Sequence, residues 1–199
     1  MHEPWSADGP SRVIHGDNLE AISALPDAAF RLIYVDPPFN TGREQKRVAL
    51  RTARADDGDR VGFKGQRYSS VRIGTKSYAD VFDDYLSFLE PRLREAHRLL
   101  TPTGSFFLHL DYREVHYAKV LCDLVFGREC FMNEIIWAYD YGARSRTRWP
   151  AKHDNILWYV RDPAEFTFRL DEADRIPYMA PTLVGADKAG QGKTPTDTW

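Results

Sequence analysis

The run Leu32-Ile33-Tyr34-Val35, followed at once by Asp36-Pro37-Pro38-Phe39, constrains this chain more than any other feature. The apolar run predicts a buried strand, and the two prolines end it because neither carries the backbone N–H that a β-ladder requires. The strand therefore delivers a carboxylate, rigid carbonyl acceptors and an aromatic ring to the carboxyl edge of a sheet, where open α/β folds bind their ligands. This combination suits a planar substrate that carries an –NH2 group. The alternative is an ordinary proline-rich turn in which Asp36 is a turn former.

Short apolar runs and helical patterns alternate along the chain, which predicts an α/β fold with a mostly parallel sheet and flanking helices. The 78–100 helix contains Pro91, where we expect a kink or two abutting helices. Asp111 is expected to cap the helix of 111–126, with Glu114 completing a capping-box-like start and Gly127 following its end. The expected helices cover residues 18–24, 78–100 and 111–126, and the expected strands cover residues 13–15, 31–35, 105–110, 134–138, 155–160 and 166–168.

Composition and charge place the chain among ordinary globular proteins. Its 199 residues suffice for one domain with a sizeable core, and its net charge is only −2. Residues 43–77 differ, because ten basic residues oppose four acidic ones there. We expect a long basic loop in this segment, which is either a patch for an anionic polymer or simply a solvated loop. Cys122 and Cys130 fit no metal-ligand or disulfide pattern, so no metal site is predicted.

The chain divides into three parts by composition. Residues 1–11 form a loose N-terminus, residues 12–170 form the main domain, and residues 171–199 are polar and rich in turns. No signal peptide or membrane-spanning run is evident, so we expect a cytoplasmic protein with no membrane contact. Within the main domain, residues 139–153 interleave rings with positive charge, which suits contact with DNA phosphates and bases. The DNA-contact candidates are Arg144, Arg146, Arg148, Trp149 and Lys152. The alternative is a surface loop with a satisfied tryptophan.

A series of short motifs, each present once, is spread along most of the chain. In order, they are Gly16-Asp17, Asp36 to Gly42, Asp80 to Leu86, Gly104 to Asp111, Asn133 to Trp137, His153 to Leu157 and Pro195 to Trp199. Together they resemble the site-specific DNA methyltransferases of the amino-group type, which modify adenine N6 or cytosine N4. The order is that of permuted members, in which the catalytic half precedes the cofactor half. The resemblance implies a Rossmann-like methyltransferase fold, double-stranded DNA as substrate, S-adenosylmethionine as cofactor and a place in restriction-modification.

The resemblance also implies roles for individual residues. Asp36 and the Pro37 carbonyl, with Pro38 in the same turn, would accept hydrogen bonds from the target amine, and Phe39 would stack on the flipped base. Asp17, together with Asp36, would contact the cofactor, although Asp17 also reads as a helix N-cap. The preference for adenine over cytosine rests on family frequency alone.

Three further side chains at strand ends are open to interpretation. His109 and Asp111 could line the same cleft, although we favour the cap role for Asp111. Trp137 is expected in the core rather than on a base.

The chain departs from the family in one respect. The glycine-rich turn that approaches the methionine end of the cofactor is missing, since Gly190-Gln191-Gly192 has no strand before it and no helix after it. We therefore expect a sheet that is incomplete at the C-terminus and that needs a further cofactor-binding half or a dimer partner. The alternative function is a non-catalytic DNA-binding fragment or one half of a split methyltransferase. Methylation of a protein glutamine or an RNA base is disfavoured by Asp36, where those relatives tend to carry Asn.

Overall fold

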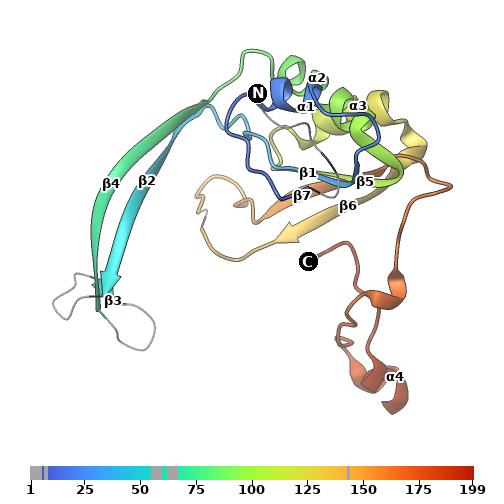
Figure 1. The fold of residues 1–199 in the computed structure, drawn as a ribbon. Helices are drawn as coiled ribbons and strands as arrows, with labels where there is room; N and C mark the ends of the chain where they lie inside the picture. Colours follow the sequence, from blue (N-terminus) through green and yellow to red (C-terminus); the bar gives the residue numbers. More distant parts are fainter. Residues whose placement is uncertain (1–5, 7–8, 55–59, 62–66, 143) are drawn as a thin grey trace. The chain divides into compact units, whose positions relative to one another are not determined.

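The computed structural model describes residue 6 and residues 9–54, 60–61, 67–142 and 144–199. The chain divides into two compact units (Figure 1). The first unit comprises residues 1–39 and 84–199, and the second comprises residues 40–83.

A four-stranded sheet forms the centre of the first unit. Its strands, in order across the sheet, are β1 (Phe30–Val35), β5 (Leu100–Leu110), β7 (His153–Val160) and β6 (Phe131–Ala138). β1 and β5 are parallel, whereas β7 is antiparallel to both β5 and β6. The α/β class is confirmed, but only one of these three pairings is parallel, fewer than expected. The reason is local, because β6 and β7 follow one another without a crossover helix.

The helices α1 (Asn18–Ser23), α2 (Tyr85–Leu99) and α3 (Val115–Phe126) lie on one side of this sheet (Figure 1). Phe106, Leu108 and Leu110 are fully buried, because alternate residues of a strand point to the same face. α2 packs on β5 and contributes Leu89 and Leu93 to this core. Each such side chain stabilises the fold by about 1.5–3 kcal/mol. None of the helices in the described ranges has the length and hydropathy needed to cross a membrane.

Helix α2 begins at Tyr85, seven residues later than the periodicity predicted. The Asp84 carboxylate caps it by accepting a 3.0 Å hydrogen bond from the Ser87 N–H. A single helix then runs through Pro91 to Leu99, so the two abutting helices are not seen. Residues 78–80, which the periodicity assigned to this helix, belong instead to a strand of the second unit.

Helix α3 begins at Val115, so the prediction that Asp111 caps this helix is wrong; Asp111 caps the turn that precedes it. One Asp111 carboxylate oxygen accepts a 2.9 Å hydrogen bond from the Arg113 N–H. Glu114 occupies the N-cap position, but its side chain makes no capping bond, so the capping box is not formed. Gly127 closes the helix as predicted, with a φ of 96° that favours glycine.

Two predicted strands are wrong. Residues 13–15 and 166–168 have no strand assignment. The Val13 side chain is fully exposed and the Ile14 side chain is 62% exposed. A strand needs a neighbour to satisfy its backbone groups, and a short apolar sequence cannot supply one by itself.

The second unit is a three-stranded antiparallel sheet, where a long loop was expected. β2 (Arg43–Arg54) pairs along its length with β4 (Arg67–Asp80), and β3 (Arg60–Val61) pairs with the beginning of β4. The buried Asp80 carboxylate accepts hydrogen bonds from the Asn40 and Thr41 N–H groups, at 2.8 and 3.1 Å. Among the ten basic residues of this segment, only the side chains of Arg43 and Arg67 are described. The predicted patch for an anionic polymer therefore lies largely outside the described residues.

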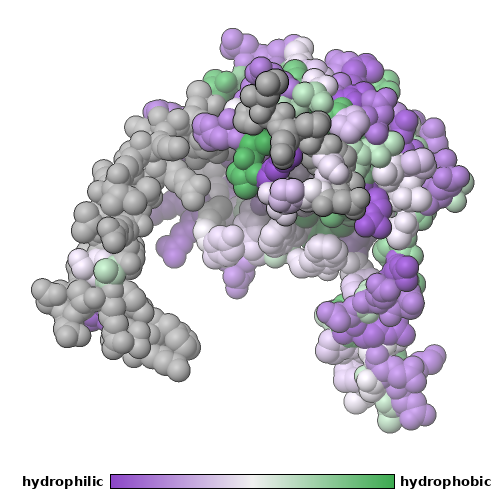
Figure 2. All heavy atoms as spheres, in the orientation of Figure 1, coloured by the Kyte–Doolittle hydropathy of each residue, from purple (hydrophilic) through white to green (hydrophobic). Residues whose placement is uncertain are grey.

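The C-terminal part of the chain carries η3 (Leu170–Glu172), η4 (Pro181–Leu183) and α4 (Ala186–Gln191). Hydrophilic residues dominate the surface around α4 (Figure 2). The final residues then lie along β6, where the Ile136 N–H donates to the Asp197 carbonyl at 2.7 Å and the Trp199 N–H donates to the Ile136 carbonyl at 2.9 Å. The end of the chain thus covers the outer edge of β6 (Figure 1).

Candidate active site

The Asp36–Phe39 loop leaves β1 at its carboxyl end, where Val35 pairs with Leu108 of β5. Asp36 is exposed, and the two prolines and Phe39 are partly buried. The buried Tyr85 donates a 2.7 Å hydrogen bond from its hydroxyl to the Pro38 carbonyl. This bond fixes the loop against the start of α2. The acceptor role expected of the loop therefore rests on Asp36 and the Pro37 carbonyl.

A polar cluster lies beside this loop, built by one side chain from each strand of the sheet. By strand register, Tyr34, His109, Asp154 and Trp137 share the face opposite the helices. The Tyr34 hydroxyl lies 2.8 Å from His109 Nδ1, and His109 Nε2 lies 3.5 Å from an Asp154 carboxylate oxygen. The Phe39 ring meets the imidazole edge-on, with 5.5 Å between ring centroids. The sheet register thus brings a histidine and a carboxylate next to the Asp36–Phe39 loop.

Asp17 lies at the start of α1, where both of its contacts are structural. Its carboxylate accepts a 2.8 Å hydrogen bond from the Leu19 N–H, so the N-cap interpretation is confirmed. The same carboxylate accepts a 3.1 Å hydrogen bond from Arg92 of α2. Its cofactor role stays a prediction, and the N-cap role does not preclude it.

A cavity of about 500 Å³ lies among α1, α2 and β1. Its walls are mainly apolar and include Ile22, Phe30 and Phe88, while Asn18 and Asp36 are among its polar lining residues. Asn18, which follows Asp17, and Asp36 therefore open onto one cavity. Asp17 itself is not part of the lining.

The 139–153 segment is a surface loop between β6 and β7. Arg144, Arg146 and Arg148 are exposed, and Trp149 is 93% exposed, so the satisfied tryptophan of the alternative interpretation is not seen. The Lys152 ammonium donates to three backbone carbonyls, at 2.9, 2.8 and 3.1 Å. Lys152 therefore holds the loop together, which leaves the arginines and Trp149 as the surface available for contact.

Trp137 and Asp111, which lie at strand ends, differ in burial. Trp137 is not in the core, since it is 47% exposed and stacks on the His109 ring with 5.5 Å between centroids. Asp111 is buried and contacts the Arg113 guanidinium. Burial raises the pKa of the Asp111 carboxyl, and the hydrogen bonds from Arg113 offset only part of this effect.

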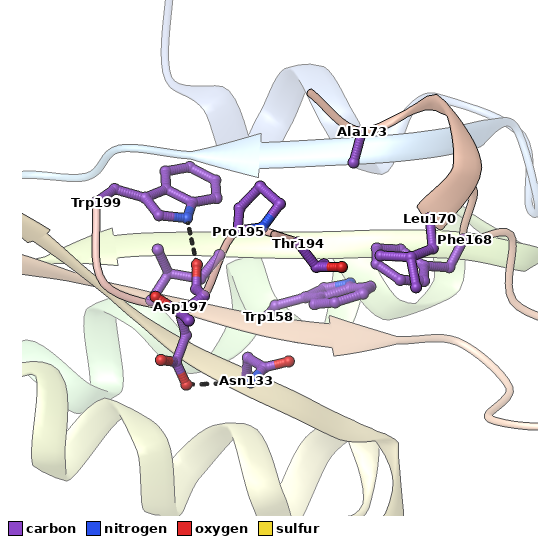
Figure 3. A pocket seen from close by; sticks show the side chains of 11 residues that line it. Asn133, Trp158, Phe168, Leu170, Ala173, Thr194, Pro195, Asp197 and Trp199 are labelled. Carbon is purple, nitrogen blue, oxygen red and sulfur yellow. Dashed lines mark hydrogen bonds between the residues drawn. The ribbon is translucent and has the colours of Figure 1, made fainter. Parts of the chain in front are cut away.

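A separate cavity of about 490 Å³ lies between β6, β7 and the C-terminal segment (Figure 3). Trp158 and Phe168 form an aromatic wall, with 5.4 Å between ring centroids, and Trp199 closes another side. Asp197 is the single ionisable residue of the lining. No residue of the Asp36–Phe39 loop is among its lining residues, so this cavity is separate from the one beside Asp36.

Sequence reasoning assigned no role to Tyr34, Tyr85 or Asp154. Tyr85 was included in the apolar spacing of α2, and Tyr34 in the apolar run of β1. Asp154 fell within a recognised motif, His153 to Leu157, but nothing in the local sequence indicated what it faces. Only the pairing of β5 with β7 brings Asp154 to His109.

The Asp-Pro-Pro-Phe loop lies at the carboxyl end of a strand in an α/β sheet, where such folds bind their ligands. The chain belongs to the DNA methylase family of N6 and N4 amino-methyltransferases, whose model matches residues 30–199. The family predicted from the motifs is thereby confirmed. The permuted order and the missing cofactor half stay predictions.

Individual relatives agree with this family. The chain is 26% identical to the type II methyltransferase M.ScaI of Streptomyces caespitosus, covering 100% of this chain and 58% of that protein. It is also 26% identical to the EcoP15I Mod subunit of Escherichia coli, a type III restriction-modification enzyme, over 75% of this chain and 24% of that protein. The chain thus spans well under two thirds of the length of these relatives.

The fold is similar to that of the PvuII DNA methyltransferase, which is named as cytosine-N4-specific. The TM-score is 0.51 at 14% sequence identity, covering 92% of this chain and 54% of the PvuII enzyme. At this identity, the similarity describes the fold alone.

Proposed function

We propose that this chain is the catalytic part of an S-adenosylmethionine-dependent DNA methyltransferase. It would methylate the exocyclic amine of a flipped base, adenine in preference to cytosine. The observation that carries the proposal is the Asp36–Phe39 loop, which Tyr85 holds at the carboxyl end of β1. Family membership supports the reaction class, and the preference for adenine rests on family frequency.

In this proposal, the chain binds and orients the amine. The exposed Asp36 carboxylate and the Pro37 carbonyl each accept a hydrogen bond from the target –NH2 group, which directs the nitrogen lone pair away from them. S-adenosylmethionine, when bound, would supply an electrophilic methyl group from its sulfonium sulfur, which would become a neutral thioether. The exposed Asp36 would lie on the side from which the amine loses its proton to solvent. Most of the rate acceleration then comes from positioning in a fixed, preorganised site.

The cavity beside Asp36 is the proposed cofactor site. Its apolar walls suit the adenine ring, and Asn18 and Asp36 provide polar groups at its border. The acidic Asp36 would also favour a sulfonium cation. The described lining contains no glycine-rich turn for the methionine end. We therefore propose that the residues present hold mainly the adenosine end, with Asp17 next to the cavity.

Double-stranded DNA is the proposed substrate, and the 139–153 loop is its proposed contact. The exposed guanidinium groups of Arg144, Arg146 and Arg148 suit phosphates, and the exposed Trp149 suits stacking on a base. Phe39 would receive the target base, which must leave the duplex because its amine is otherwise paired. Lys152 contributes by holding the loop rather than by reaching phosphate.

A second candidate is a DNA-binding subunit whose cofactor wall is supplied by another polypeptide segment. The position of β1 favours this second candidate, because β1 is an edge strand of the four-stranded sheet and its Leu32 side chain is 61% exposed. An edge strand next to an open cavity can accept a further strand. Calorimetric titration with S-adenosylmethionine separates the two candidates, since only the first predicts binding by the chain alone.

The proposed function is tested by methyl transfer from labelled S-adenosylmethionine to plasmid DNA. The Asp36→Ala variant should transfer no measurable methyl group while keeping its thermal stability and its salt-dependent DNA affinity, because Asp36 is exposed. The matched control is Asp171→Asn, an exposed carboxylate in η3. Equal loss of activity, stability and DNA affinity would make Asp36 structural. Mass spectrometry of the digested DNA then distinguishes N6-methyladenine from N4-methylcytosine.

A further inference from the structure

We infer that His109 is a positioning residue that sets the orientation of the Phe39 ring, and that Tyr34 and Asp154 hold its imidazole in place. This inference rests on the proposed function, in which Phe39 stacks on the target base. It adds an element that the Asp36–Phe39 loop lacks, namely a support for the stacking ring that comes from β5 and β7 together with Tyr34 of β1.

Two aromatic rings enclose the imidazole. Phe39 meets it edge-on at an interplanar angle of 61°, and Trp137 stacks on it at an angle of 21°. The two centroid separations are both 5.5 Å, within the range of favourable aromatic pairs. The His109 side chain is only 12% exposed. Any rotation of the imidazole would therefore displace the Phe39 ring.

Polar contacts set the rotation of the imidazole. The Tyr34 hydroxyl lies 2.8 Å from Nδ1, and burial, followed by the charges of Asp36 and Asp154, raises the pKa of Tyr34. On the other side of the ring, Nε2 faces an Asp154 oxygen at 3.5 Å. The other Asp154 oxygen accepts a 3.2 Å hydrogen bond from the Tyr139 hydroxyl. Polar groups thus lie next to both ring nitrogens of His109, and Tyr139 in turn fixes Asp154.

A packing role alone does not account for this arrangement. His109 Nε2 is buried and makes no hydrogen bond of normal length. A buried polar nitrogen without a close partner destabilises a fold, so an apolar ring would pack better at this position. The imidazole instead fits a role in which its orientation matters, because only a group with polar atoms on two sides can be held by both Tyr34 and Asp154. We assign it no contact with the reacting atoms.

The decisive experiment removes the polar contacts of the His109 imidazole and leaves an aromatic ring at each position. Tyr34→Phe deletes one hydroxyl, His109→Phe keeps a ring without polar atoms, and Tyr117→Phe on the exposed face of α3 is the matched control. Initial rates of methyl transfer to plasmid DNA are compared for these three variants and for the double variant that combines Tyr34→Phe with His109→Phe. Their DNA affinities are compared by fluorescence anisotropy.

We expect kcat to fall by about 10- to 100-fold in Tyr34→Phe and in His109→Phe, because a small misplacement of a positioning group has effects of that size. DNA affinity should stay unchanged, since phosphate contacts dominate it. The double variant should be no slower than His109→Phe, because both changes break the same connection. Additive losses, or losses in DNA affinity without a change in kcat, would overturn the inference.

A readout that does not depend on activity separates this inference from the proposed function. The Phe39 ring protons, assigned by NMR through a Phe39→Leu variant, should shift in Tyr34→Phe and stay fixed in Tyr117→Phe. If the wild-type chain transfers no methyl group but the Phe39 resonances respond in this way, the proposed function fails and the positioning role stands. If the resonances do not move, the positioning role fails whatever the activity.

Discussion

The hydroxyl of Tyr85, in the first turn of α2, donates a 2.7 Å hydrogen bond to the carbonyl of Pro38 in the Asp36–Phe39 loop. Tyr85 is only 4% exposed, so this bond is shielded from water. Neither proline of the loop can donate a backbone N–H, and the loop therefore depends on donors from outside it. The Tyr85 hydroxyl, at the start of α2, is such a donor.

The first prediction concerns this bond. Tyr85→Phe keeps the ring but leaves the Pro38 carbonyl without its donor, which should lower the free energy of unfolding by about 1–3 kcal/mol. Urea denaturation measures this loss, and the exposed Tyr117→Phe should show none. Under the proposed function, kcat should fall in Tyr85→Phe while DNA affinity is kept. Unchanged stability would mean that the loop is held by other contacts.

The position of the Asp36–Phe39 loop could be predicted from the sequence because its determinants are adjacent in the chain. An apolar run predicts the strand, and two prolines end it, so Asp36 and Phe39 had to emerge at a strand end. The partners of the loop could not be predicted in the same way. His109 and Asp154 are 45 residues apart and meet only because β5 pairs with β7. The sequence gives no local sign of that antiparallel pairing.

The 40–83 unit shows that local sequence can also fail to predict a sheet. Its charged residues and weak periodicity indicated a loop, whereas β2 and β4 form a long antiparallel ladder. Strand formation depends on the partner as much as on intrinsic propensity, and backbone pairing tolerates a polar sequence. The Asp80 clamp on Asn40 and Thr41, which fixes where the ladder begins, joins residues about 40 positions apart. A reading of local windows misses a contact of that span.

The second prediction concerns the arginines of the 139–153 loop. Arg146→Ala should weaken DNA binding to all sequences alike and should reduce the slope of log K against log salt by about one. The physical reason is the loss of one phosphate contact and its released counterions. Anisotropy titrations over a range of salt concentrations measure the slope, and Arg94→Ala on the exposed side of α2 is the control. Equal effects of both changes would place the DNA surface elsewhere.

The third prediction concerns Lys152, whose ammonium holds three carbonyls of the same loop. Lys152→Met keeps the aliphatic stem but removes the donors, so the loop should open and become sensitive to protease. Limited proteolysis followed by mass spectrometry locates the new cleavage near residues 140–152. The salt slope of DNA binding should change less than in Arg146→Ala, because Lys152 is not expected to meet phosphate. A slope change as large as that of Arg146→Ala would assign Lys152 a direct contact.

The fourth prediction concerns the pH dependence of stability through Asp123 in α3. Burial alone would raise the pKa of this carboxyl, but the hydrogen bonds from Lys119 and Tyr159 outweigh it and hold the pKa below its ordinary value. Lys119 Nζ lies 2.7 Å and the Tyr159 hydroxyl 2.6 Å from the same carboxylate oxygen. A depressed pKa means that the folded state favours the charged carboxylate. Its contribution to stability is therefore complete above the ordinary value and is lost as the pH falls through the folded-state pKa.

Asp123→Asn should consequently lower the free energy of unfolding by about 1–3 kcal/mol at pH 7, and the difference from wild type should shrink below about pH 4. Guanidinium denaturation at a series of pH values between 7 and 3.5 measures that difference. Asp171→Asn, an exposed carboxylate in η3, should show no such trend. A difference between Asp123→Asn and wild type that stays constant down to pH 3.5 would show that the amide disturbs packing and that the carboxylate charge is not what stabilises α3 against β7.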